Sequence, residues 1–198
     1  MICLILLALG TGFMGGYYLL GLESKSTLDL ILMNALNVIV FIGGLEIGGN
    51  KEIVKKMLRV KTLGLILAVP LGCIVGSIIG GGLVGALIGV SWRDAILVSS
   101  GMGWYSFSSV VISAMYSNEV GTVAFIANAF RETLSFVLVP VAARFTNLAC
   151  VSIGGASTMD STLPVILKYT NMQIGVIGFI NGVLLTLIVP FLISFLLP

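Results

Sequence analysis

The sequence has 198 residues, of which 58% are hydrophobic and only 9% are charged, and its formal net charge is +2. Because an ordinary soluble domain carries about 25% charged residues, this composition excludes a soluble globular protein and predicts an all-α polytopic membrane protein. The chain has no histidine, and its three cysteines lack the spacing of metal ligands, so we expect no metal, no cofactor and no disulfide framework.

Seven apolar stretches follow one another along the chain, and each has about the 20 residues that a transmembrane helix requires. They cover about residues 2–20, 28–47, 62–87, 95–115, 120–142, 147–169 and 172–197. The first stretch has neither a basic n-region nor a small-residue cleavage site, so we expect it to remain as a helix and not to be removed as a signal peptide. Since the connecting segments are short, residues 1–198 are predicted to form a single transmembrane domain.

One segment between the second and third stretches is strongly basic and predicts the orientation of the chain. Residues 51–61 contain half of the ten basic residues and a single acidic residue. By the positive-inside rule this segment is cytoplasmic, which puts the N-terminus inside and the C-terminus outside. Lys25, Arg93 and Arg144 then lie on the outer side and weigh against this orientation. Because the positive charge is concentrated in one loop, it indicates topology and not nucleic-acid binding.

Glycines and polar residues interrupt two of the predicted helices. In the first, four glycines between residues 10 and 16, among them Gly12, allow either close helix packing or local unwinding. The fourth opens with the polar run of residues 99–109, which cannot face lipid throughout and must lie against protein or water. Within that run, Trp104 and Tyr105 would either form a wall or gate of a cavity or belong to an aromatic belt at the membrane surface.

Three charged residues lie near the middle of predicted helices, where an ionised side chain costs roughly 2.5–3.5 kcal/mol on insertion scales. They are Arg131 and Glu132 of the fifth helix and Asp160 of the sixth, with Asn128 one turn before the first pair. Arg131 could form a structural ion pair with either carboxylate, which would leave the other carboxylate over as a proton carrier. Neighbours on a helix point about 100° apart, so we expect Glu132 to face a cavity and Arg131 a neighbouring helix.

The sixth predicted helix contains residues 153–164, a segment of small, hydroxyl-bearing and acidic residues that predicts a break in the helix. Gly154 and Gly155 permit unusual backbone angles, and Pro164 is suited to the start of a second half-helix. The hydroxyl residues of the segment are Ser157, Thr158, Ser161 and Thr162. The alternative is an extended loop that re-enters the membrane and only closes a packing gap.

A break of this composition at membrane depth predicts a transporter's substrate site. The exposed amides of a half-helix, with the hydroxyls beside them, suit a substrate carboxylate, while Asp160 and Glu132 suit an ammonium group. The same site would therefore hold a cationic amino acid at both ends. An intramembrane enzyme is not predicted, because the chain has no histidine, no G-x-S-x-G motif and no second aspartate beside Asp160.

Three stretches, residues 101–106, 128–132 and 154–164, together resemble the bacterial lysine exporter family LysO in residues, order and spacing. The resemblance implies a multi-pass secondary transporter in the bacterial plasma (inner) membrane. It implies export of L-lysine, with other cationic amino acids as further candidates, in exchange for protons, and it makes Glu132 and Asp160 the essential acidic pair. The alternatives are a carrier of the same fold for another solute, such as an organic anion or sodium, and a non-transporting membrane subunit.

The family itself resembles cation/proton antiporters and bile-acid carriers, which are built from inverted five-helix repeats with crossing broken helices. On this resemblance residues 62–198 form a complete second repeat and residues 1–47 end a first one. The glycines of residues 10–16 would be the second break, facing residues 154–164. Relative to the long family members the chain lacks about three N-terminal helices, so we expect a separately encoded small membrane subunit or another copy of the chain to supply them.

Overall fold

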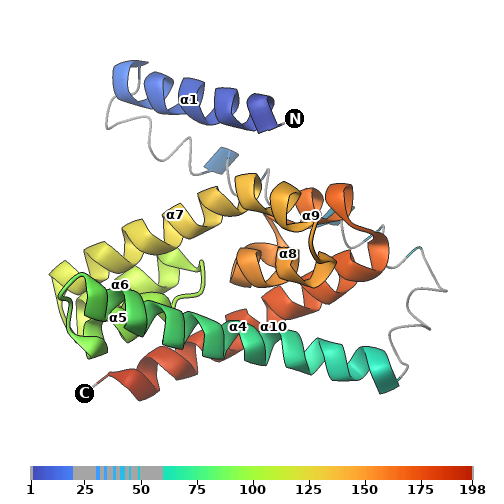
Figure 1. Cartoon of the computed structure of the whole chain (residues 1–198). Coiled ribbons are helices and arrows are strands. Elements are labelled where there is room, and N and C mark those ends of the chain that lie inside the picture. The colour runs from blue at the N-terminus through green and yellow to red at the C-terminus, as the bar shows by residue number, and fades with distance from the viewer. Residues whose placement is uncertain are drawn as a thin grey trace.

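The computed structural model describes residues 2–19, single residues between 30 and 49, and residues 60–197. Its helices are α1 (Ile2–Leu19), α4 (Val60–Leu87), α5 (Trp92–Ser99), α6 (Tyr105–Met115), α7 (Asn118–Ala142), α8 (Asn147–Gly154), the 3-10 helix η2 (Gly155–Met159), α9 (Leu163–Tyr169) and α10 (Met172–Leu196) (Figure 1). No strand occurs within these described ranges, so the prediction of an all-α protein is confirmed.

Three of the described helices are long and apolar enough to cross a membrane. They are residues 64–87 of α4, all of α7 and all of α10, and they match the third, fifth and seventh predicted helices. Each continues through an internal proline, at Pro70, Pro140 and Pro190, which neighbouring helices make tolerable in a membrane. The second predicted helix and the basic segment up to residue 59 lie outside the described residues apart from single positions. The count of seven spans and the orientation of the chain therefore stay predictions.

Two of the predicted helices are each divided into shorter ones. The sixth is divided into α8, η2 and α9, which confirms the predicted break. The fourth is also divided, into α5 and α6, so the expectation of one continuous helix over 95–115 was wrong. Positive φ angles at Met102 (49°), Gly103 (96°) and Gly155 (65°) mark the two breaks, since an α-helix cannot continue through such angles.

The glycines of α1 do not form the second break that was expected. α1 is a continuous helix from Ile2 to Leu19, and among the described helices it packs mainly beside α7 (Figure 1). A Cβ atom added at Gly10, Gly12, Gly15 or Gly16 would have no described atom within 4 Å. A glycine weakens a helix by about 1 kcal/mol relative to alanine but does not by itself break it. The break that contacts residues 154–164 is instead the turn between α5 and α6.

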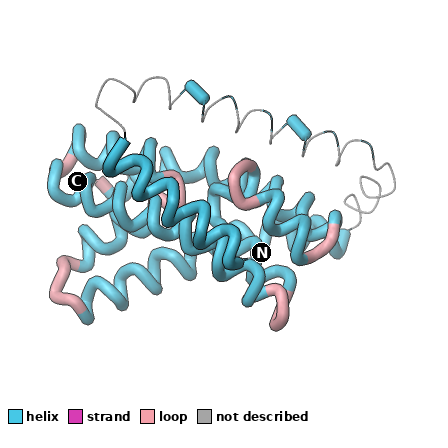
Figure 2. Tube along the Cα trace, turned by 90° about the horizontal axis from the view of Figure 1, so that it is seen from above, coloured by secondary structure: helices cyan, strands magenta, loops and turns pink. Residues whose placement is uncertain are grey.

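The two broken helices lie among the three long helices, and short loops join the elements (Figures 1 and 2). In Figure 1, α7 runs above the breaks, α4 runs below them and α10 crosses α4. Buried side chains from α4 to α10 form one core cluster around the breaks: Cys73, Leu97, Met102, Ile112, Ala124, Ala156, Leu185, Val189 and Ile193. The tertiary structure thus holds both breaks at the centre of the helices.

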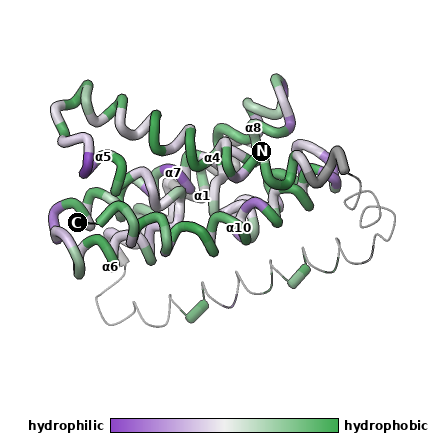
Figure 3. Tube along the Cα trace, turned by 90° about the horizontal axis from the view of Figure 1, so that it is seen from below, coloured by the Kyte–Doolittle hydropathy of each residue, from purple (hydrophilic) through white to green (hydrophobic). Residues whose placement is uncertain are grey.

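The helices α4 and α10 consist mostly of hydrophobic residues, as the hydropathy colouring in Figure 3 shows. Large hydrophobic side chains on α4, α7 and α10 are more than half exposed, among them Leu71, Val123, Leu187 and Phe191. The buried polar side chains include Asn128, Thr158 and Asn181. An apolar exterior around a partly polar interior is the arrangement expected of a protein immersed in lipid.

Candidate functional site

Side chains on one face of α7 contact both breaks. Asn128, Arg131, Glu132 and Ser135 stand at positions i, i+3, i+4 and i+7 of this helix, so their side chains share a face. Each of the four contacts a different part of the two breaks. The two charged residues diverge to either side of this face, as the angle between helix neighbours predicts.

Asn128 fixes the turn between α5 and α6. The amide of Gly103 donates to Asn128 Oδ1 at 2.8 Å, and Asn128 Nδ2 donates to the carbonyls of Val98 (2.8 Å) and Ala124 (2.9 Å). The side chain is 3% exposed. Asn128 therefore satisfies backbone groups on both sides of the first break, which is a support role and not a substrate contact.

The two breaks contact one another through backbone groups. The amide of Ala156 donates to the carbonyl of Met102 at 2.9 Å. A Cβ atom on Gly155 would lie 2.4 Å from the same carbonyl oxygen, and Gly155 already has a positive φ. Position 155 therefore requires glycine for both its backbone angle and the close approach of the other break.

Arg131 points away from the carboxylates, toward α4 and the end of α8. Its guanidinium donates to the carbonyl of Ser152 (Nη2, 3.2 Å), the hydroxyl of Ser77 (Nη1, 3.0 Å) and, with longer contacts, to Ile153 and Cys73. Within the described part of the chain, neither of the two alternative ion pairs forms. The expectation that Arg131 faces neighbouring helices is confirmed.

Glu132 and Asp160 are brought together by Ser161. The hydroxyl of Ser161 donates to Glu132 Oε1 and lies 3.3 Å from Asp160 Oδ1, which also accepts the Ser161 amide at 2.5 Å. Both carboxylates are partly buried. Two carboxylates this close to one hydroxyl form a site that favours a bound cation or a proton.

The other hydroxyl residues of the break hold its shape. Ser157 Oγ donates to the carbonyl of Gly154 at 3.0 Å and lies 2.6 Å from the hydroxyl of Thr162. Thr162 in turn lies 3.1 Å from the hydroxyl of Ser135 on α7, and Thr158 donates to the carbonyl of Gly155 at 2.8 Å. These side chains are buried, so Ser161 is the hydroxyl of the segment that directly contacts both carboxylates.

The amides at the start of α9 already have acceptors. The amides of Asp160 and Thr162 donate to the carbonyl of Ser157, and those of Leu163 and Val165 donate to the carbonyls of Asp160 and Thr162. The Ser161 amide is bonded to Asp160 Oδ1, and Pro164 has no N–H group. In this conformation the start of α9 therefore offers no free amide to a substrate carboxylate, contrary to expectation. The reason is that the tight turns pair these amides with nearby oxygens of the same segment.

Asn181 of α10 is a polar residue of the break that sequence reasoning missed. Its Nδ2 donates to the carbonyl of Gly155 (3.0 Å) and the hydroxyl of Thr158 (3.1 Å), and its side chain is completely buried. Its Oδ1 is the one buried side-chain oxygen or nitrogen without a partner among the described residues. At the next position, a Cβ on Gly182 would lie 2.5 Å from the Met159 nitrogen. The signal was an Asn-Gly pair in an otherwise apolar span.

The aromatic pair divides between two environments. Trp104 stacks on Phe107 with a centroid distance of 4.6 Å and packs against the apolar core cluster. Tyr105 makes an edge contact with Phe125 at 5.3 Å. Trp104 is thus mainly a packing residue, and the role of Tyr105 as a wall of the site stays a prediction.

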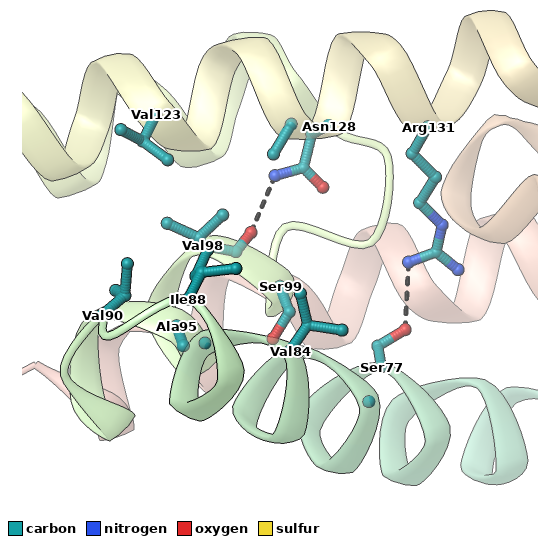
Figure 4. Close-up of a pocket in the computed structure, with 14 residues that line it drawn as sticks. Ser77, Val84, Ile88, Val90, Ala95, Val98, Ser99, Val123, Asn128 and Arg131 are labelled. Carbon is teal, nitrogen blue, oxygen red and sulfur yellow. Dashed lines mark hydrogen bonds between the residues drawn. The ribbon is translucent and has the colours of Figure 1, made fainter.

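A cavity of about 390 Å³ lies between α4, α5 and α7 (Figure 4). Its lining is mostly aliphatic and includes Val84, Val98 and Val123, while its polar members are Ser77, Ser99, Asn128 and Arg131. Arg131 lines this cavity and Glu132 and Asp160 do not, so it is not the cavity that Glu132 was expected to face. No group of three or more metal-binding side chains occurs among the described residues.

Comparison with known sequences identifies the family. The profile of the family described as lysine exporter LysO matches residues 6–197. The chain belongs to the lysine exporter LysO family. Membership in LysO confirms the resemblance carried by residues 101–106, 128–132 and 154–164. LysO is a family of transporters and not of enzymes.

Two LysO relatives define how much of the family the chain covers. It is 27% identical to lysine exporter LysO of Escherichia coli (strain K12) over 191 residues, which are 96% of this chain and 61% of the relative. It is 31% identical to a putative lysine exporter of Haemophilus influenzae over 162 residues, which are 81% of this chain and 80% of the relative. The chain thus spans about three fifths of the E. coli relative. No solved structure matches the chain.

Proposed function

We propose that this chain exports L-lysine from the cytoplasm in exchange for protons, and that Glu132 and Asp160 bind the substrate's ammonium group and the protons in turn. The observation that carries the proposal is the bridge of Ser161 between the two partly buried carboxylates at a helix break. The names of the E. coli and H. influenzae relatives support lysine as the substrate.

The electrostatics of the carboxylate pair explain why substrate and proton would exclude one another. Two ionised carboxylates at short range repel, and this repulsion is stronger inside a membrane than in water. Either an ammonium group or a proton relieves it, so each displaces the other from the same pair. The negative charge of the site disfavours an organic anion as the substrate, and sodium is the competitor that a transport assay has to test.

The residues around the pair have different proposed roles. Ser161 exchanges its hydrogen bond between the carboxylates and the substrate, and Tyr105 forms a wall of the site. Ser157, Thr158 and Thr162, with Gly154 and Gly155, maintain the shape of the break. Asn128 and Arg131 support it from α7, and Trp104 packs beside it.

The proposed setting is the bacterial plasma (inner) membrane, with several crossings, a cytoplasmic N-terminus and an external C-terminus. Residues 62–198 are proposed to be one repeat of an inverted-repeat carrier and residues 1–47 the end of the other. Because α1 is continuous, we place the twin of the 154–164 break in a further membrane segment. A separately encoded small membrane subunit or a second copy of the chain would contribute it.

Transport in proteoliposomes tests this function. The purified chain, alone and with a candidate small membrane subunit, is reconstituted with radiolabelled lysine inside and a pH-sensitive dye. We expect lysine efflux coupled to proton entry, and we expect Asp160→Asn and Glu132→Gln each to reduce efflux by about 100-fold or more, because each leaves one carboxylate for both ligands.

The matched control is Glu119→Gln, which neutralises an exposed carboxylate in the first turn of α7. Its efflux should equal that of the wild type. Unchanged efflux in Asp160→Asn and Glu132→Gln would refute the proposed role of the pair. Proton movement that requires external sodium but no lysine would instead identify a sodium carrier. No transport in any assembly would favour a non-transporting subunit.

A further inference from the structure

The last carbonyl groups of α8 need partners because the helix stops at Gly154. The amide of Gly155 donates to the carbonyl of Val151, and the hydroxyl of Ser157 donates to that of Gly154. The two carbonyls in between, at Ser152 and Ile153, accept from the guanidinium of Arg131. Arg131 of α7 therefore caps the C-terminus of α8, and its positive charge lies at the negative end of the helix dipole, where a cation is stabilising.

The same guanidinium also reaches α4. It donates to the hydroxyl of Ser77 at 3.0 Å and contacts the thiol of Cys73 at 3.5 Å. Cys73 in turn contacts the carbonyl of Ser152 at 3.6 Å. Figure 4 shows Arg131 extending from α7 toward Ser77 on α4. One side chain thus joins three helices at the level of the break.

Arg131 and Glu132 hold opposite ends of the break. Arg131 binds the last turn of α8, and Glu132 accepts from Ser161, two residues before α9 begins. The Nη2 atom of Arg131 also lies 3.1 Å from the position of a Cβ on Gly155. Since both side chains leave the same turn of α7, the position of residues 155–161 relative to Glu132 depends on the Arg131 contacts.

We propose that Arg131 is a positioning residue for the carboxylate pair. Arg131 caps α8 and joins it to α4. These contacts position the break so that Ser161 can hydrogen-bond to Glu132 and to Asp160. A lysine side chain at this position keeps the charge but lacks the planar fork that reaches two carbonyls and a hydroxyl together. The inference rests on the proposed function for its transport readout but not for its structural one.

The experiment combines lysine kinetics with alkylation of Cys73, which is 4% exposed beneath the guanidinium. In a background with Cys3→Ala and Cys150→Ala, the variants Arg131→Met, Arg131→Lys and Ser77→Ala are reconstituted and treated with N-ethylmaleimide. We expect Arg131→Met to raise the KM for lysine and the alkylation rate by about tenfold or more, Arg131→Lys by about threefold, and Ser77→Ala by about twofold. The kcat should change less than the KM. Arg144→Met, at an exposed arginine just after α7, is the matched control and should match the background protein in both readouts.

Wild-type KM and alkylation rate in Arg131→Met would overturn the proposal. If Arg131→Met does not accumulate in the membrane, Arg131→Lys and Ser77→Ala decide. A raised KM and a raised Cys73 alkylation rate in both variants support the positioning role. Unchanged KM and alkylation rate in both show that Arg131 serves folding alone. If no protein moves lysine, the proposed function has failed, and the alkylation rates still decide whether Arg131 holds α8 against α4.

Discussion

The two breaks share a construction but differ in chemistry. The turn between α5 and α6 and the segment between α8 and α9 each contain a positive φ, and they contact one another through the Ala156 amide and the Met102 carbonyl. The first is closed by the neutral side chain of Asn128, whereas the second contains Asp160 and meets Glu132. Both breaks expose backbone groups, and the residue opposite each one on α7 decides whether a neutral amide or a carboxylate meets it.

The largest expected effect is on the contact between the two breaks. Gly155→Ala introduces a Cβ 2.4 Å from the Met102 carbonyl at a residue with φ of 65°. We expect it to reduce stability by more than about 2 kcal/mol, since backbone strain and collision add, and to abolish transport. Thermal unfolding in detergent and lysine efflux measure the two effects.

The control for this substitution is Gly72→Ala in α4, where no described atom lies within 4 Å of the added Cβ. It should lower neither the unfolding temperature nor the lysine efflux, since alanine favours a helix. Equal behaviour of the two variants would show that the breaks do not depend on their mutual contact.

The next effect separates support from binding. Asn128→Ala leaves the buried amide of Gly103 without its acceptor, which costs about 1–3 kcal/mol. We expect a lower unfolding temperature with an unchanged KM for lysine in the protein that remains folded. Asn118→Ala, at an exposed position at the start of α7, is the control. A raised KM at unchanged stability would mean that the first break also contributes to binding.

Ser161→Ala should give the reverse result. It removes the hydroxyl shared by Glu132 and Asp160 but no buried backbone partner. We expect the KM for lysine to rise by about three- to tenfold, because a hydrogen bond contributes a net free energy of about 0.5–1.5 kcal/mol, with the unfolding temperature nearly unchanged. Ser106→Ala, at an exposed serine of α6, is the matched control in both measurements. A KM for Ser161→Ala equal to that of the control would remove Ser161 from the proposed site.

The smallest effect concerns the glycines of α1, where a second break was expected but the helix is continuous. Gly12→Ala places a methyl group in space free of described atoms within the continuous helix α1. We expect stability to be unchanged or to rise by up to about 1 kcal/mol, with normal transport, because alanine favours a helix. Loss of transport at full stability would indicate that α1 unwinds or meets a partner during the cycle.

The sequence alone predicted the membrane class, the three long helices and the residues of the second break. Long apolar stretches, membrane-embedded charges and the combination of Gly154, Gly155 and Pro164 are local signals that do not depend on the rest of the fold. The divergence of Arg131 and Glu132 could also be predicted, since helix geometry sets it. The family resemblance came from the same local motifs and was confirmed by the family match.

Only the tertiary structure decided where the breaks meet and what they contact. The turn at Met102 and Gly103 is stabilised by Asn128, 25 residues beyond Gly103, and by Ala156, so no local pattern could distinguish it from a polar helix. Asn181 reaches the break from α10, whereas the glycines of α1 remain helical and have no described atom within 4 Å of an added Cβ. Propensity and polarity act within a few residues, whereas a helix opens where distant side chains satisfy the backbone groups that the opening exposes.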